Sequence, residues 1–353
     1  MVVPGIMGSS LFYEAPGSAD EIWGENFLSN YRRLLENPAV LQWRRDGRCT
    51  GRVMKQVFVS RYQLWPKIQL WSRVLETIRT HADFSIPDAV VEFGYDWRDS
   101  VIESASELGR RLARVTSGDV KKDRPKDKPT FVFVTHSMGG LVARVAVGSG
   151  AIHPSWIDSM IYIGSPLKGA PVAFRAAYDR MTLPFINEFT RLLRWRNTAL
   201  FIQHLYACFR TFPSLYQLMP HEGHPYIGYT ASELWNPLSD DVVPREFRSA
   251  AHECQSMLAV GSRTLVAAQT RVLSICTHVN ATHPTDLFYR VEEVTGEHPA
   301  YRILETLGTT VQGDGTVPRE SAATGTTYHV QNVDHAYLCN NKHVADILKT
   351  IMG

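Results

Sequence analysis

The residues most capable of chemistry lie together in the stretch Thr135-His136-Ser137-Met138-Gly139-Gly140. An apolar, β-rich run at 131–134 leads into it, and a helical pattern at 141–147 follows it. A serine on such a strand-to-helix turn holds its hydroxyl above the sheet, and small neighbours let the backbone pass closely. We therefore predict that Ser137 is a nucleophile, although Thr135 stands where the common GxSxG pattern has glycine. The alternative is a glycine-rich turn without chemistry.

A serine nucleophile needs a base and an acid, and in this arrangement they follow it in the order Ser, Asp, His. Asp314 lies in a turn framed by glycines, within 311–318. His335 comes just after the last predicted strand, where a loop can bring an imidazole over the serine. The base would take the serine proton, and the acid would hold the correct tautomer and stabilise the imidazolium. We predict Asp314 and His335 in these roles.

Other residues compete for the acid and base roles. Asp240 and Asp241 resemble an acid turn, but no predicted strand precedes them. Asp334 adjoins His335, yet neighbours on an extended segment point apart. Among the other histidines, His136 beside the serine and His329 inside the final strand are interpreted as structural.

An oxyanion hole requires two backbone N–H donors. The residue after the nucleophile, Met138, supplies one by its position, and the helix N-terminus adds partial positive charge there. The second donor is expected from the glycine-containing segment 3–10, which follows an early strand. We assign it to Ile6, with Met7 as the alternative; an ordinary glycine-rich turn is the competing interpretation.

Short apolar runs alternate with helical patterns along the chain, which is typical of a parallel sheet with crossover helices. The expected strands lie at 2–3, 89–93, 131–135, 157–163, 272–276 and 327–331. An amphipathic helix is expected at 64–78, and a C-terminal helix from about 341. With the serine turn, this order predicts an α/β-hydrolase fold with a mostly parallel central sheet flanked by helices.

The alternation stops after the fourth strand. Residues 171–265 are rich in aromatic residues, arginine and helix-forming residues, so we predict a helical cap inserted within a single domain spanning 1–353. The basic, aromatic-rich stretch at 192–206 fits transient contact with a lipid interface. Packing of an apolar cap face on the core is the favoured explanation, because cap helices must bury one face.

Composition limits the possible partners and compartments. Lys and Arg number 37 against 35 Asp and Glu, a balance that gives no footprint for nucleic acid. The chain offers no 18-residue apolar run and no basic, then apolar, leader pattern, although the very short first strand leaves open a start further upstream. Five scattered cysteines fit a reducing compartment, so a cytoplasmic location is expected. No ligand spacing for a metal and no cofactor motif is found, and the oligomeric state stays open.

Taken in order, several motifs resemble those of the lecithin:cholesterol acyltransferase-like α/β hydrolases, which include lysosomal phospholipase A2 and phospholipid:diacylglycerol acyltransferases. The matching segments are 2–9, 22–24, 95–98, 136–140, 164–171, 212–220, 313–318 and His335. The resemblance implies Ser137, Asp314 and His335 as the triad, and Ile6 and Met138 as the oxyanion hole. The disulfide-closed lid of the animal members is not reproduced, because Cys49 stands alone in that region. Their secretion signal is not matched either.

The expected reaction is acyl transfer from an ester to Ser137, followed by transfer to water or to another alcohol. A lipase or phospholipase is the leading hypothesis, and transfer to a lipid acceptor is its close variant. The alternatives are a short-chain carboxylesterase without lipid preference and a non-catalytic binding protein on the same fold.

Overall fold

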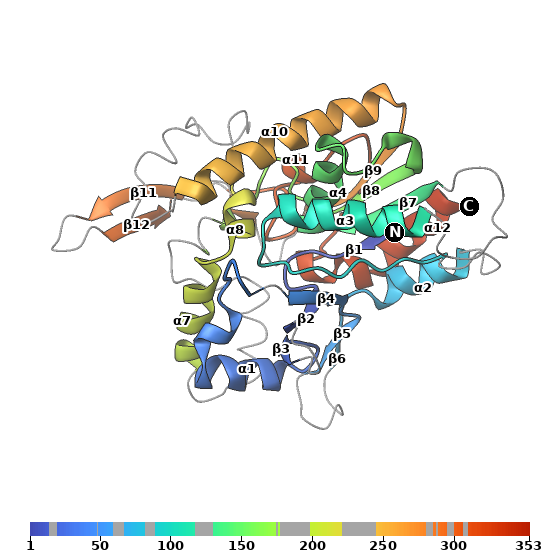
Figure 1. Cartoon of the computed structure of the whole chain (residues 1–353). Coiled ribbons are helices and arrows are strands. Elements are labelled where there is room, and N and C mark those ends of the chain that lie inside the picture. The colour runs from blue at the N-terminus through green and yellow to red at the C-terminus, as the bar shows by residue number, and fades with distance from the viewer. Residues whose placement is uncertain are drawn as a thin grey trace.

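The computed structural model contains a central sheet of parallel strands (Figure 1). The strands are β1 (Val2–Val3), β7 (Phe131–His136), β8 (Ile157–Ile163), β9 (Arg271–Val279) and β14 (Thr326–Gln331), and they lie side by side in that order. All four pairings are parallel. The structure describes residues 1–13, 20–47, 49–58, 67–81, 89–116, 130–173, 176, 198–220, 245–279, 285–286, 289–294, 300–305 and 310–353.

The middle of this sheet is apolar on both faces, as the uninterrupted runs in the sequence predict. In β8 the four residues from Met160 to Ile163 are fully buried, and in β7 Phe133 and Val134 are buried as well. Strands covered on both faces must be flanked by helices on both sides. The α/β fold class predicted from the sequence is confirmed.

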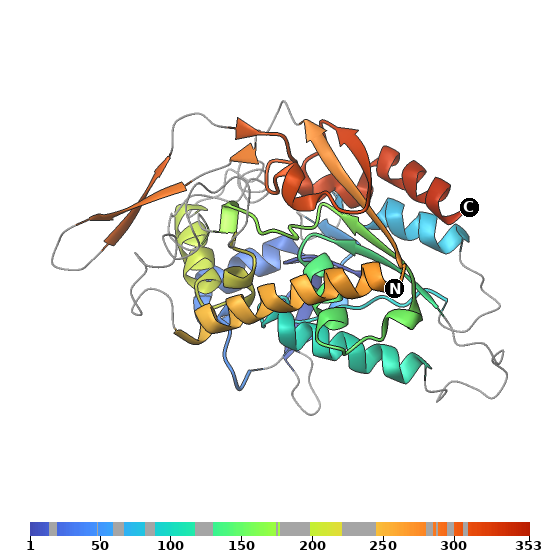
Figure 2. The same ribbon diagram turned by 90° about the horizontal axis from the view of Figure 1, so that it is seen from above.

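Helices cover the sheet on two sides (Figure 2). On one side lie α3 (Val101–Thr116), α4 (Met138–Gly148) and α10 (Arg245–Ala267), which contact one another. On the other side lie α2 (Ser72–His81) and α12 (Lys342–Met352). The backbones of α4 and α10 approach each other closely where glycines face the opposite helix, because a Cβ on Gly148 or Gly261 would collide with backbone atoms.

Two expected elements differ from the structure. The segment expected as a strand at 89–93 makes an isolated parallel bridge between Glu92 and Val2 at the edge of the sheet. The helix expected at 64–78 begins only at Ser72, because Lys67–Gln69 forms a strand, β6, paired antiparallel with β5 (Gln56–Phe58). Local periodicity could not anticipate this pairing, because it is made with another segment.

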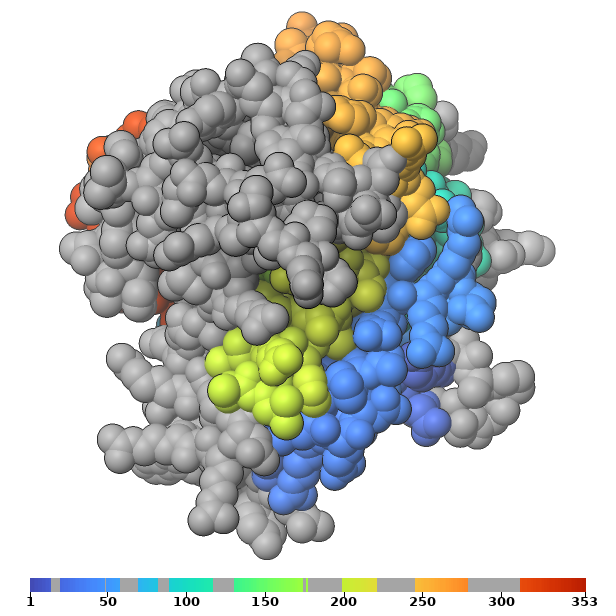
Figure 3. Space-filling model, turned by 90° about the vertical axis from the view of Figure 1, so that its left-hand side faces the viewer, coloured from blue at the N-terminus to red at the C-terminus, as the bar shows by residue number. Residues whose placement is uncertain are grey.

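A second layer is formed by the N-terminal region. Strands β2 (Ser9–Tyr13), β3 (Glu21–Trp23) and β4 (Cys49–Val53) form a small antiparallel sheet. Helices α1 (Phe27–Glu36) and η1 (Pro38–Leu41) contact β3 of this sheet. Helix α7 (Thr198–Phe209) packs on α1, with the Phe201 ring 5.7 Å from Phe27 and 4.9 Å from Tyr31. Figure 3 shows α1 and α7 side by side on one face of the molecule.

The predicted cap at 171–265 is described only in part. Its helix α7 packs on α1 and η1 of the N-terminal layer. The short α8 (Pro213–Gln217) packs on α10 and α3, and α10 packs along α4 as a crossover helix between β8 and β9. A cap with these bounds stays a prediction, because 177–197 and 221–244 lie outside the described residues.

The remaining elements lie mostly between β9 and the C-terminus. Two antiparallel pairs, β10 (Thr285–Asp286) with β13 (Thr310–Val311) and β11 (Tyr289–Val294) with β12 (Ala300–Glu305), follow β9. Helix α11 (Arg319–Ala322) precedes β14, η3 (His335–Asn340) follows it, and η2 (Pro154–Trp156) precedes β8. None of the helices within the described ranges combines the length and the hydropathy needed to cross a membrane.

Candidate active site

Ser137 occupies the turn between β7 and α4 that the sequence predicts. Its backbone has φ 53° and ψ −130°, a conformation that a non-glycine residue adopts only at a cost. Its amide N–H donates to the carbonyl of Ile163 at 3.0 Å, which ties the turn to the neighbouring strand. A Cβ on Gly5 would lie 2.6 Å from the Ser137 Cβ, so only glycine lets the N-terminal loop pass this close.

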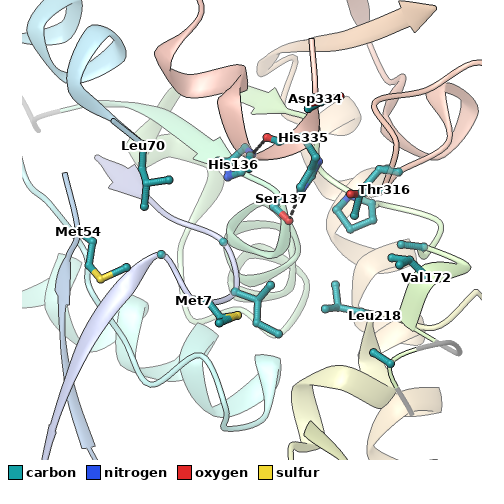
Figure 4. Close-up of a pocket in the computed structure, with 18 of the residues that line it drawn as sticks. Met7, Met54, Leu70, His136, Ser137, Val172, Leu218, Thr316, Asp334 and His335 are labelled. Carbon is teal, nitrogen blue, oxygen red and sulfur yellow. Dashed lines mark hydrogen bonds between the residues drawn. The ribbon is translucent and has the colours of Figure 1, made fainter. Parts of the chain in front are cut away.

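His335 lies over the serine from the loop that follows β14 (Figure 4). Its Nε2 is 2.8 Å from the Ser137 Oγ, and its Nδ1 is 2.7 Å from the Asp314 Oδ2. The contact between serine and histidine joins residues 198 positions apart. The hydrogen-bonded order Ser, His, Asp is the arrangement in which an imidazole can accept the serine proton while a carboxylate holds its tautomer.

Asp314 is held by the turn that contains it. Its Oδ1 accepts the backbone N–H groups of Thr316 at 3.0 Å and Val317 at 2.7 Å, which leaves Oδ2 for His335. Its carbonyl also accepts the His335 N–H at 3.0 Å. At Gly164, which has φ +56°, a Cβ would lie 3.2 Å from Oδ2 and 3.3 Å from the His335 Nδ1. The Gly164 backbone therefore lies so close to the Asp314–His335 hydrogen bond that a side chain there would contact both residues.

The two segments proposed for the oxyanion hole lie beside the serine. Met138 is the first residue of α4, and Ile6 and Met7 line the cavity into which Ser137 opens. Met7 has φ 59°, and the Gly8 N–H donates to the carbonyl of Gly5 at 3.0 Å, so this segment is a tight turn. The roles of Ile6 and Met138 as donors stay predictions.

The competing acids and bases lie elsewhere or make other contacts. Asp240 and Asp241 fall outside the described residues. Asp334 lines the cavity, but the carboxylate on the His335 Nδ1 is that of Asp314. His329 contacts Cys276 and His278 on the neighbouring strand.

His136 contacts the base directly, which the sequence did not indicate. Its Nε2 is 3.0 Å from the backbone carbonyl oxygen of His335, and the two rings lie 4.8 Å apart. Burial, followed by the proximity of His335, lowers the pKa of His136 to about 3. The ring is therefore neutral wherever His335 could act as a base.

The cavity above Ser137 is lined mainly by apolar side chains. In Figure 4, Met54 and Leu70 lie on one side of Ser137, with Val172 and Leu218 on the other. Segments of the chain that precede α2 contribute further large side chains that sequence reasoning missed, among them Trp23, Phe27, Met54, Val57 and Trp71. No local motif marks them, so only the tertiary packing of the described segments reveals them.

The Tyr95–Arg98 segment supports the site without reaching it. Tyr95 donates its hydroxyl to the carbonyl of Pro4 at 2.8 Å, just before the loop that carries Ile6. Arg98 is fully buried and pairs with Asp96 at 2.7 Å, so the two charges offset each other. The segment thus positions the N-terminal loop through the Tyr95 hydrogen bond.

Comparisons with known proteins identify similarity over part or all of the chain. A family model described as a PGAP1-like alpha/beta domain matches residues 110–198, or 89 of the 353 residues. An uncharacterized protein of Saccharomyces cerevisiae, YJR098C, is 38% identical over 77 residues. That match covers 22% of this chain and 10% of the yeast protein. The chain thus matches only a small part of the relative's length.

A solved structure is similar in fold over nearly the whole chain. The structure titled as the Tle4–Tli4 complex has a TM-score of 0.55 and 13% identity, covering 99% of this chain and 97% of that one. The mature form of Bacillus licheniformis lipase BlEst2 has a TM-score of 0.38 and 10% identity, covering 74% and 77%. The chain has an α/β-hydrolase fold, and the narrower resemblance to acyltransferase-like members rests on the motifs alone.

Proposed function

We propose that this protein is a serine ester hydrolase that forms an acyl-enzyme on Ser137. The observation that carries the proposal is the continuous chain of hydrogen bonds from Ser137 through His335 to Asp314, at 2.8 and 2.7 Å, opening into an apolar cavity. A scaffold without activity has no need to keep a serine in a strained turn within reach of an oriented imidazole. The family match and the fold agree with this chemistry.

In the proposed reaction the Ser137 Oγ attacks the ester carbonyl carbon while His335 Nε2 takes the serine proton. The carbonyl oxygen becomes an oxyanion, which the N–H groups of Ile6 and Met138 stabilise. The C–O bond to the alcohol then breaks, and the leaving alkoxide takes the proton from His335. Water, deprotonated by the same imidazole, attacks the acyl-enzyme and releases the carboxylic acid.

We propose a long-chain acyl ester, such as a glyceride or a phospholipid, as the substrate. The support is the apolar lining on both sides of Ser137, because each methylene buried from water contributes about 0.8 kcal/mol. Among the described lining residues none is Lys or Arg, so the walls favour an uncharged chain over an anionic group inside the cavity. Entry from a lipid interface through the cap belongs to the same proposal, and Leu200 on α7 is exposed there.

Transfer of the acyl group to an alcohol acceptor is the finer form of this proposal, and the motif resemblance to acyltransferase-like hydrolases supports it. A carboxylesterase acting on short, soluble esters is the second candidate. The triad geometry fits a lipid hydrolase and a short-chain carboxylesterase equally well, so activity on different substrates must distinguish them.

The test compares the wild type with Ser137→Ala on short soluble esters, neutral glycerides and phospholipids, with and without an added long-chain alcohol. We expect release of long-chain acid by the wild type and a loss of several orders of magnitude in the variant. A new ester in the presence of the alcohol would identify a transferase. Turnover of short esters alone would identify a carboxylesterase, and equal rates in the two proteins would exclude Ser137 as the nucleophile.

A further inference from the structure

His136 joins the nucleophile and the base by a second route. The backbone carbonyl of His335 can only accept a hydrogen bond, so the His136 Nε2, 3.0 Å away, must carry the donated proton. His136 is bonded covalently to Ser137, whose Oγ is 2.8 Å from the His335 ring. Nucleophile, base and His136 thus form a closed ring of covalent and hydrogen bonds across residues far apart in the chain.

We propose that His136 is a positioning residue: its ring N–H fixes the backbone of the catalytic base relative to the nucleophile. Three other hydrogen bonds join His335 to Asp314 and Ser137. Its N–H donates to the Asp314 carbonyl at 3.0 Å, and its ring contacts Asp314 and Ser137. Only the bond from His136 ties the His335 carbonyl to the strand that carries the serine.

The surroundings of the ring suit a neutral donor. Trp71 lies edge-on to His136, with ring centroids 6.0 Å apart at 87°, and is itself buried. The His335 ring lies 4.8 Å away, tilted by 33°. A charged His136 would repel the imidazolium that forms on His335 during the reaction. Burial and this neighbour lower the pKa of His136 to about 3, so it stays neutral.

Catalysis depends strongly on such alignment, since a displacement of about 1 Å can reduce a rate roughly 100-fold. The β14–η3 loop reaches the serine from the far edge of the sheet, because β9 and β8 lie between β14 and β7. Without the His136 bond, His335 keeps its contacts with Asp314 and Ser137 and its place at the start of η3, but its carbonyl loses the tie to β7. The alternative is that His136 only fills space beside Trp71.

Two amides separate these roles. In His136→Gln the amide nitrogen falls near the position of Nε2 and can still donate to the His335 carbonyl. In His136→Asn it falls near Nδ1 and cannot reach. Ser274→Ala is the control for a general loss of stability, because it removes a fully buried hydroxyl that donates to the Thr324 carbonyl at 2.9 Å and does not line the cavity.

The readout is the rate at which a fluorophosphonate labels the serine, normalised to the fraction of protein labelled at completion. Because it requires no knowledge of the natural ester, it tests positioning separately from substrate class; the proposal itself rests on the proposed serine chemistry. We expect His136→Asn to react roughly 10- to 100-fold more slowly than wild type, with His136→Gln within about threefold and Ser274→Ala unchanged. The Asn variant should also lower kcat on a soluble ester without raising KM.

Equal labelling rates in the Asn, Gln and wild-type proteins would overturn the positioning role, even if the melting temperature fell. So would an equal loss in Asn and Gln, since the position of the donor would then not matter. A wild-type protein that is not labelled at all would refute the proposed serine chemistry instead, so the two failures are distinguishable.

Discussion

Replacing Asp314 by asparagine tests the acid with little change of shape. The asparagine oxygen can still accept the N–H groups of Thr316 and Val317, which are 3.0 and 2.7 Å from Oδ1. The amide N–H₂ then replaces Oδ2, which is 2.7 Å from the His335 Nδ1. Since the amide donates, Nδ1 must accept, and the imidazole proton moves to Nε2.

An imidazole protonated on Nε2 cannot take the proton of Ser137. The same change of tautomer in a well-studied serine protease lowers kcat about 10⁴-fold, and at 1.36 kcal/mol per factor of ten this equals about 5.4 kcal/mol of transition-state stabilisation. We expect a loss of that order in Asp314→Asn. The fold should keep most of its stability, because one charge-assisted hydrogen bond becomes a neutral one, a difference of about 1–2 kcal/mol.

The matched variant is Asp334→Asn, because Asp334 is the neighbouring carboxylate that the sequence left as an alternative acid. Both variants are assayed for kcat on a soluble ester and for labelling of Ser137, with unfolding by urea as the check on folding. We expect less than a tenfold loss for Asp334→Asn. If Asp334→Asn lost 10³-fold or more while Asp314→Asn kept activity, the assignment of the acid would be wrong.

Three further changes probe the loop, the cavity and the buried histidine. Gly5→Ala places a Cβ 2.6 Å from the Ser137 Cβ and so displaces the nucleophile. We expect kcat to fall roughly 100-fold in a protein that still unfolds cooperatively. An unchanged kcat would refute the close approach of the Gly5 backbone to Ser137. Leu218→Trp fills one side of the cavity, and excluding two methylenes of a long acyl chain from it costs about 1.6 kcal/mol. The kcat/KM for dodecanoyl esters should therefore fall about tenfold, and that for acetyl esters should change little. Equal losses for both esters would argue against an acyl site there. The pKa of His136 falls from 6.5 to about 3 on folding, so lowering the pH from 6.5 to 4.5 protonates this ring only in the unfolded state and destabilises the fold. Over these two pH units the difference amounts to about 2 kcal/mol. Urea unfolding at both pH values should show a weaker pH dependence in His136→Gln, and equal dependence would contradict the shift.

Local sequence by itself determined the parallel strands and the position of the nucleophile. The uninterrupted apolar runs at β7 and β8 require burial on both faces, and the small residues around Ser137 mark a tight strand-to-helix turn. The order of Ser137, Asp314 and His335 along the chain was also readable, because on such a sheet the carboxyl ends of the strands meet at one edge. These features depend on periodicity, residue type and order, all of which are local or topological.

Tertiary structure alone decided which carboxylate contacts the base, how the cavity is walled and where His136 points. The sequence favoured Asp314 over Asp334 as the acid, but only the placed loops show the contact itself, since a hydrogen bond depends on tenths of an ångström. The strand pairing of Lys67–Gln69 and the packing of α1 on α7 bring Met54, Trp71 and Phe27 toward Ser137. Contacts between distant segments arise from the packing of the whole chain, so no single stretch of sequence encodes them.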